Sequence, residues 1–291
     1  MKLFSFFTQE LAIDLGTANT LIMSDGKVVV DEPSIVAIDR RTGETIAVGL
    51  KAMQMHEKTH ENIKTVRPLR DGVIADFQAA ENMIEGLINM IGNRRRFFSH
   101  LKMVICIPSG ITEVEKRAVF DSADHVDSKE TYLIHEPMAA ALGIGLEGEE
   151  PIGNVIIDIG GGTTEIAVIA LSGIVCDQSI RTAGDEFTAD IIDYMKRAHN
   201  ILIGERTAEQ IKIHVGSALH EPENPPADYA VNGRDLMTGI PKQITISYHE
   251  VAQAIDKSIG KVEEAVMKAL ESTPPELAAD IMSGQHLLTG V

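Results

Sequence analysis

The chain has 291 residues, of which 44% are hydrophobic, and a formal net charge of −17 at pH 7. Such an excess of acidic side chains repels a phosphate backbone, and 4% aromatic residues without tryptophan leave little material for stacking on bases, so the composition argues against nucleic acid as a partner. The length allows one large or two medium domains, and no apolar run reaches the roughly 20 residues that span a bilayer.

The first half of the chain predicts strands that alternate with helices. Periodicity predicts a hairpin over residues 11–23, strands over 27–30, 34–38, 45–48 and 102–107, a short polar helix around 53–61, and helices over 77–91 and 113–123. Thr112 precedes the last of these helices and is followed by acidic residues, so it is a candidate N-cap. This alternation predicts an α/β fold.

A polar loop with glycine and proline over residues 147–153 marks the expected hinge between the two halves. The second half predicts a strand–turn–strand unit from residue 155, helices over 184–199, 208–218 and 248–270, a loop over 222–226 and a short strand over 244–246. The last helix carries one apolar stripe and is expected to pack against the core.

One strand–turn–strand signature occurs twice, over residues 11–21 and 155–165. In each copy an apolar strand ends in an aspartate, Asp14 or Asp158, and a turn rich in glycine and threonine follows. Glycines let backbone N–H groups approach an anion closely, and an aspartate beside them suits a hydrated Mg²⁺ bound to a phosphate. A single copy is a common turn, with the aspartate capping it, whereas two copies predict a clamp for a nucleoside triphosphate.

These hairpins resemble the two phosphate loops of the actin, sugar-kinase and heat-shock-chaperone superfamily. Further motifs narrow the resemblance to MreB, the bacterial actin family that organises wall growth in rod-shaped cells: residues 13–21, 71–76, 107–112, 136–141, 158–165 and 203–212. The likeness runs from about residue 11 to residue 279. It implies an actin-like, ribonuclease-H-like α/β ATPase fold, with two related domains around a nucleotide cleft.

The resemblance also implies domain limits. Domain I would cover residues 1–146, with a small α/β insert over about 32–70. Domain II would cover residues 147–291, with a small, partly helical insert over about 185–245. MreB continues past a Leu-Thr-Gly-Gly-Gly motif that holds the adenosine, whereas this sequence reads Leu288-Thr289-Gly290-Val291, so we expect domain II to be incomplete at its C-terminal end.

The same resemblance assigns ligands to both hairpins. Asp14 and Asp158 would line a Mg²⁺–phosphate site through water. The phosphates of ATP would be bound from the two sides by Thr17, Ala18, Asn19, Gly160, Gly161, Gly162 and Thr163.

Four residues outside these turns would complete the site. Glu136 would position or activate the attacking water, with Thr164 as a weaker candidate beside it; the alternative for Glu136 is an acid that stabilises a helix N-terminus. Glu209 and Lys212 would reach the ribose and adenine, because residues three apart share a helix face; alone they form a solvated ion pair.

Two segments combine apolar and basic residues, a composition that is typical of segments that bind at a membrane interface. Residues 1–7 are rich in phenylalanine, and Phe97 and Phe98 follow three arginines. MreB inserts such a segment or loop into the inner membrane. The alternative is that Phe97 and Phe98 pack beneath the following strand.

The resemblance thus implies an ATP-dependent filament protein at the inner face of the cytoplasmic membrane, which guides wall synthesis and rod shape. Its partners would be copies of itself and membrane-bound morphogenetic proteins, and a weak ATPase activity would time filament turnover. The alternative is a sugar or acid kinase on the same fold, for which no acceptor-site base is evident. A chaperone-type ATPase is disfavoured because no substrate-binding domain follows the ATPase core.

Overall fold

The computed structural model describes residues 8–91, 100–146, 150–283 and 286–290. The chain forms two compact units, which are described separately. Unit 1 comprises Met1–Arg181 and Lys268–Val291, and unit 2 comprises Thr182–Met267. The predicted boundary between residues 146 and 147 divides the chain at another place and stays a prediction.

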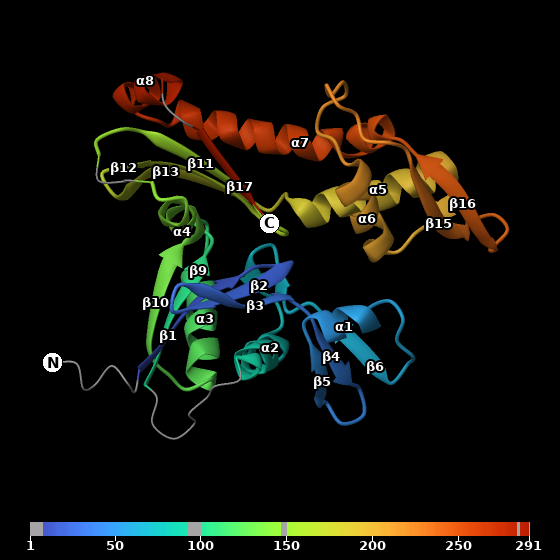
Figure 1. The fold of residues 1–291 in the computed structure, drawn as a ribbon, viewed down its shortest axis with the longest axis horizontal. Helices are drawn as coiled ribbons and strands as arrows, with labels where there is room; N and C mark the ends of the chain where they lie inside the picture. Colours follow the sequence, from blue (N-terminus) through green and yellow to red (C-terminus); the bar gives the residue numbers. More distant parts are fainter. Residues whose placement is uncertain (1–7, 92–99, 147–149, 284–285, 291) are drawn as a thin grey trace. The chain divides into compact units, whose positions relative to one another are not determined.

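The first sheet of unit 1 has the strand order β10-β9-β1-β2-β3 (Figure 1). Its strands are β1 (Thr8–Leu15), β2 (Asn19–Ser24), β3 (Lys27–Pro33), β9 (His100–Ile107) and β10 (Ser128–His135). β1, β9 and β10 run parallel, whereas β1–β2 and β2–β3 are antiparallel hairpins, which confirms the hairpin predicted over residues 11–23. The apolar alternation along β1 buries Leu11, Ile13 and Leu15 in the core.

Two helices, α2 (Phe77–Met90) and α3 (Glu113–His125), contribute to the same core. In α2 the helical spacing buries Met83, Ile84, Leu87 and Ile88. Thr112 caps α3 as predicted, because its hydroxyl accepts from the Glu115 N–H and the Glu115 carboxylate accepts from the Thr112 N–H.

A small three-stranded sheet of order β5-β4-β6 follows β3 in the chain. It contains β4 (Val36–Asp39), β5 (Thr45–Val48) and β6 (Ile63–Val66), and α1 (Leu50–Met55) packs on it. The helix predicted around residues 53–61 is wrong in its position, because α1 ends at Met55: His56 already has an extended ψ of 137°, and Glu57 follows with a positive φ of 58°. A short hairpin of β7 (Leu69–Arg70) and β8 (Val73–Ile74) precedes α2.

The second sheet of unit 1 has the order β13-β12-β11-β17. It contains β11 (Asn154–Ile159), β12 (Thr164–Ala170), β13 (Gly173–Ile180) and β17 (His286–Gly290), and β17 lies parallel to β11. Every residue of β12 is buried. The helices α4 (Glu136–Gly143) and α8 (Pro275–Ser283) lie against β11. The sequence pattern did not identify β13, β17 or α8.

Unit 2 is a three-stranded sheet with helices around one core. Its strands are β14 (Ile201–Leu202), β15 (Tyr229–Asp235) and β16 (Pro241–Ile246), and its helices are α5 (Gly184–His199), α6 (Glu205–Val215) and α7, which runs from Tyr248 to Glu271 beyond the unit. Residues 184–199 form the helix that the periodicity predicts, and the apolar stripe of α7 places Val251 and Ile255 in the core as expected. Within the described part of the chain, every helix is too short or too polar to cross a bilayer.

Candidate functional site

The two glycine-rich turns of unit 1 line one cavity of about 50 Å³. The first turn joins β1 to β2, where Asp14 pairs with Leu21, and the second joins β11 to β12, where Asp158 pairs with Glu165. The cavity is lined by Asp14, Gly16, Thr17, Ala18, Asn19, Gly72, Glu136, Asp158, Gly160, Gly161, Gly162 and Thr163. The structure therefore gathers the predicted site residues of unit 1 in one place, apart from Thr164, whose buried side chain lies on β12.

The two turns approach each other so closely that side chains cannot fit between them. A Cβ atom at Gly161 would lie 2.7 Å from the Cβ of Ala18, and one at Gly162 would lie 2.5 Å from Thr17 Oγ1. The Thr17 hydroxyl in turn accepts a hydrogen bond from the Gly72 N–H at 3.0 Å. Glycine at both positions is thus what allows the backbones to meet around a small polar space.

Three carboxyl groups face this space, and neighbouring acids perturb two of them. Burial, followed by the nearby Asp158, raises the pKa of Asp14 to about 6. Burial, followed by Glu165, Asp14 and Asp158, raises the pKa of Glu136 to about 9, and burial also raises the pKa of Asp158. Acidic groups in such an arrangement indicate a site that a cation would stabilise.

The acids that line the cavity offer oxygen ligands to a cation. Within the described ranges, no three histidine, cysteine or acidic side chains are grouped as direct ligands of a metal ion. This donor set fits Mg²⁺, which keeps several water ligands and is often bound by one or two carboxylates together with substrate phosphates.

Glu136 lies directly after the end of strand β10. β10 ends at His135, which pairs with Ile107 of β9, and Glu136 is the first residue of α4. The helix therefore begins at Glu136 itself. Both interpretations of Glu136 remain compatible with this position, since it faces the cavity and also occupies a helix N-terminus.

Glu209 and Lys212, which the resemblance predicts to contact the nucleoside, lie in unit 2. There they contact each other and α5. Lys212 Nζ lies 2.8 Å from Glu209 Oε2 and donates to the Gly184 carbonyl at 2.9 Å. The Thr188 hydroxyl donates to Glu209 Oε2 at 2.8 Å. Glu209 and Lys212 are thus fixed side by side, and their contact with a nucleoside stays a prediction.

Two features of the site lie in motifs named above, but the sequence assigned no site role to their residues Asp71, Gly72 and Glu165. Asp71 and Gly72 form a turn with φ values of 51° and 75°, and the Gly72 N–H contacts Thr17. Glu165 is a buried carboxylate that accepts hydrogen bonds from two serines. The Asp-Gly pair is a turn signal that could have been used, whereas the partners of Glu165 are distant in sequence.

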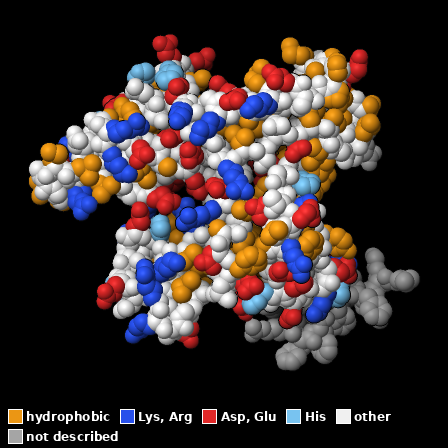
Figure 2. All heavy atoms as spheres, turned by 180° about the vertical axis from the view of Figure 1, so that it is seen from behind, with side chains coloured by type: hydrophobic (Ala, Val, Ile, Leu, Met, Phe, Trp, Pro, Cys, Tyr) orange, Lys and Arg blue, Asp and Glu red, His pale blue; other side chains and the backbone are white. Residues whose placement is uncertain are grey.

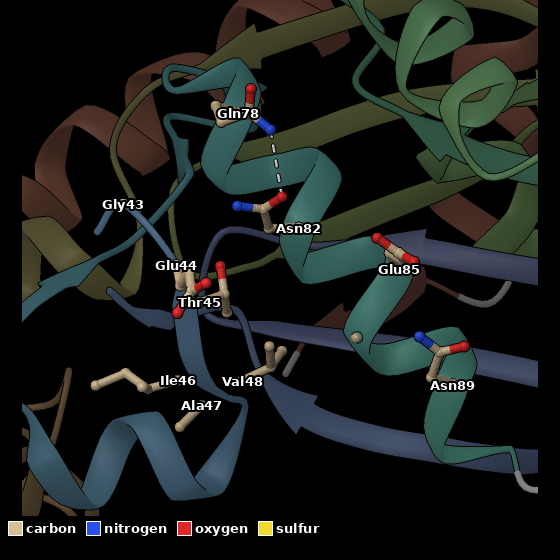
Figure 3. A pocket seen from close by; sticks show the side chains of 11 residues that line it. Gly43, Glu44, Thr45, Ile46, Ala47, Val48, Gln78, Asn82, Glu85 and Asn89 are labelled. Carbon is tan, nitrogen blue, oxygen red and sulfur yellow. Dashed lines mark hydrogen bonds between the residues drawn. The ribbon is translucent and has the colours of Figure 1, made fainter. Parts of the chain in front are cut away.

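A larger groove of about 670 Å³ lies between β5 and α2 (Figure 3). Gln78 and Asn82 of α2 point toward one another across a 3.3 Å hydrogen bond beside it, and Glu85 lies farther along the helix. The groove contains none of the predicted site residues. Residues 1–7 and Phe97 and Phe98, predicted to contact a membrane, lie outside the described residues.

The paired glycine-rich hairpins, the acids between them and the two sheets that carry them define an actin-like fold. The model of the MreB/Mbl protein family matches residues 8–291. The chain belongs to the MreB/Mbl family.

Individual relatives agree with this assignment. The chain is 45% identical to the cell shape-determining protein Mbl of Bacillus subtilis, covering 98% of this chain and 85% of that protein. It is 44% identical to the cell shape-determining protein MreB of Escherichia coli, covering 99% and 84%. Among solved structures, MreB5 of Spiroplasma citri bound to ADP has a TM-score of 0.90 at 38% identity, covering 97% of this chain and 84% of that one, and its complex with AMPPNP has a TM-score of 0.89.

Proposed function

We propose that this chain is an ATP-dependent cytoskeletal protein that polymerises with copies of itself and organises cell-wall synthesis and rod shape. The observation that carries the proposal is the single cavity in which both glycine-rich turns and three acids meet. Membership of a family whose members are named for determining cell shape supports the cytoskeletal part. The adenine nucleotides bound to MreB5 support ATP as the ligand.

In this proposal the backbone N–H groups of the two turns bind the phosphates. Thr17, Ala18 and Asn19 act from one side, and Gly160, Gly161, Gly162 and Thr163 act from the other. Asp14 and Asp158 hold Mg²⁺ through water, and the ion neutralises charge on the phosphates. Glu209 and Lys212 bind the nucleoside.

Glu136 orients the attacking water and accepts its proton, whereas Thr164 stays the weaker candidate because it lies outside the lining of the cavity. The pKa of about 9 leaves this carboxyl protonated near neutral pH, and a Mg²⁺ ion beside Asp14 and Asp158 would lower the pKa so that the group can accept a proton. Hydrolysis is slow and limits the lifetime of the filament rather than making a metabolic product. Among the described residues no feature favours the small-molecule kinase alternative.

The filament is proposed to lie on the inner face of the cytoplasmic membrane. The phenylalanine-rich residues 1–7 and the pair Phe97 and Phe98 beside arginines supply the apolar and basic groups for this contact. Membrane-bound morphogenetic proteins are the proposed partners. The net charge of −17 makes a nucleic acid partner unfavourable, and Figure 2 shows acidic side chains interspersed with lysine and arginine on the face it displays.

Titration of the chain with a fluorescent ATP analogue tests nucleotide binding. We expect saturable binding that weakens by about tenfold or more when EDTA removes Mg²⁺, since the ion screens phosphates from the acids. Asp14→Asn should remove most of this dependence on Mg²⁺. Asp121→Asn, a change at an exposed residue of α3, is the matched control and should behave as the unsubstituted chain. Absence of binding with Mg²⁺ present would contradict the proposal.

A further inference from the structure

Four polar residues form a row across the second sheet of unit 1. Glu165 on β12 pairs directly with Asp158 on β11 and with Ser179 on β13, and Asp158 pairs with Thr289 on β17. Cross-strand partners point to the same face of a sheet, and two acids directly opposite each other are destabilising. Glu165 is only 1% exposed, so this destabilisation is not relieved by solvent.

The Glu165 carboxylate is instead satisfied by two donors. Its Oε1 accepts from the Ser179 hydroxyl at 2.6 Å, within the same sheet. Its Oε2 accepts from the backbone N–H of Ser109 at 3.0 Å. Ser109 follows β9, so this second hydrogen bond joins the sheet of the second hairpin to the sheet of the first.

The segment that Glu165 holds also packs against Gly72, which in turn packs against the second glycine-rich turn. A Cβ atom at Gly110 would lie 3.1 Å from the Cβ of Ser179, so the backbone packs on β13 at this point. A Cβ atom at Gly72 would lie 2.9 Å from Pro108 and 2.8 Å from Thr163 Cγ2. Residues 108–110 therefore contact β13 at Gly110 and approach the second glycine-rich turn through Gly72.

The same segment continues from the strand beside Glu136. Ile107, the last residue of β9, pairs with His135 of β10, which immediately precedes Glu136. A shift of residues 107–109 relative to β12 would therefore move Glu136 relative to Thr163. The Glu115–Arg181 ion pair at 3.4 Å also joins this region to β13, but its arginine is 58% exposed and such a pair contributes little.

We propose that Glu165 is a positioning residue that ties residues 108–110 to the strand of the second phosphate hairpin and thereby sets the distance of Glu136 from the bound phosphates. This inference rests on the proposed ATPase function. Glu165 itself does not line the cavity, so it acts through Ser109 and the end of β9 rather than on the nucleotide. The carboxylate has one donor on β13 and one in the turn that follows β9, so it joins the two segments through both of its oxygens.

Three variants distinguish the effect of the two Glu165 hydrogen bonds on catalysis from a general effect on the stability of the fold. Glu165→Ala removes both hydrogen bonds. Glu165→Gln preserves them, because the amide oxygen can accept from Ser109 and the amide NH₂ can donate to the Ser179 oxygen. Ser258→Ala is the matched control, since the Ser258 hydroxyl donates to the Asp190 carboxylate at 2.5 Å within unit 2.

The experiment measures nucleotide affinity, single-turnover phosphate release and hydrogen exchange of the Ser109 and Gly110 amides. Glu165→Ala should slow phosphate release by about tenfold or more while affinity changes by less than about threefold, because displacement of a reacting group impairs catalysis more than binding. Bound nucleotide should protect the two amides in the unsubstituted chain but not in Glu165→Ala. Glu165→Gln should restore both properties, and Ser258→Ala should change neither.

Two results would overturn the inference. One is phosphate release in Glu165→Ala that matches the unsubstituted chain. The other is a Glu165→Gln variant as slow as Glu165→Ala, which would show that the charge matters rather than the link. An unsubstituted chain that binds no nucleotide would instead overturn the proposed function, and this inference with it.

Discussion

Replacing Gly162 with alanine is expected to abolish nucleotide binding at working concentrations. The new Cβ would lie 2.5 Å from Thr17 Oγ1 and 2.9 Å from the backbone nitrogen of Asp71. The Asp71 contact is with backbone and not with a flexible side-chain end, so the second glycine-rich turn must move away from the Asp71-Gly72 turn and from Thr17. A misplacement of about 1 Å between groups that act together lowers function by on the order of 100-fold.

The measurement is a titration of Gly162→Ala with the fluorescent ATP analogue, together with thermal unfolding. Gly260→Ala is the control, because Gly260 lies within α7 and nothing is within 4 Å of its added Cβ. Alanine there should bind nucleotide normally and stabilise the helix by about 0.5–1 kcal/mol. Unchanged affinity in a folded Gly162→Ala protein would contradict the proposed phosphate clamp.

Replacing Glu136 with alanine is expected to stop hydrolysis while nucleotide binding persists. The side chain faces the cavity that both turns line, and it is the proposed proton acceptor. Loss of a positioned acid or base lowers a rate by typically 10²–10⁴-fold. Single-turnover phosphate release should therefore fall by on the order of 100-fold or more, and filaments formed with ATP should persist longer than those of the unsubstituted chain.

Glu130→Gln is the control for that experiment. Glu130 lies on β10, the strand that precedes Glu136, but it pairs with Lys102 at the surface. Its turnover should match that of the unsubstituted chain. If phosphate release in Glu136→Ala stays within about twofold of the unsubstituted chain, Glu136 has no catalytic role and only stabilises the N-terminus of α4.

The raised pKa of Glu136 also predicts how stability depends on pH. Its pKa is 4.5 in the unfolded chain and about 9 in the folded protein, so between these values the folded state binds more protons than the unfolded state. This group therefore lowers the free energy of unfolding as pH rises through that window. Glu136→Gln lacks the titration, so denaturant unfolding at several pH values should show its stability relative to the unsubstituted chain increasing toward pH 9.

The parts of the fold that could be predicted are those specified by local sequence. The Thr112 cap needs only Glu115 three residues later, and the apolar stripe of residues 184–199 gives a helix of the observed length. The two hairpins were predicted because each lies within about ten consecutive residues. The helix predicted around residues 53–61 was misplaced because a positive φ at Glu57 cannot be inferred from hydrophobic spacing.

The parts that could not be predicted depend on contacts between distant residues. β17 is a strand because it pairs with β11, 131 residues earlier in the chain for the pair Val155 and His286. Glu165 is held by Ser109, and the separation of 56 residues leaves no local signal. The geometry of the pocket arises from such pairings. The sequence therefore indicated the residues that line the cavity, but not that Glu165, outside its lining, bonds to Ser109.

Electron microscopy of the purified chain on an anionic lipid layer, with and without Mg-ATP, tests the central claim most directly. The claim is that nucleotide bound between the two hairpins drives polymerisation on a membrane surface. Filaments that lie flat on the lipid with Mg-ATP, and that are missing without nucleotide and in Gly162→Ala, are the predicted result. A chain that binds Mg-ATP in solution yet forms no filaments on or off the lipid would contradict the claim.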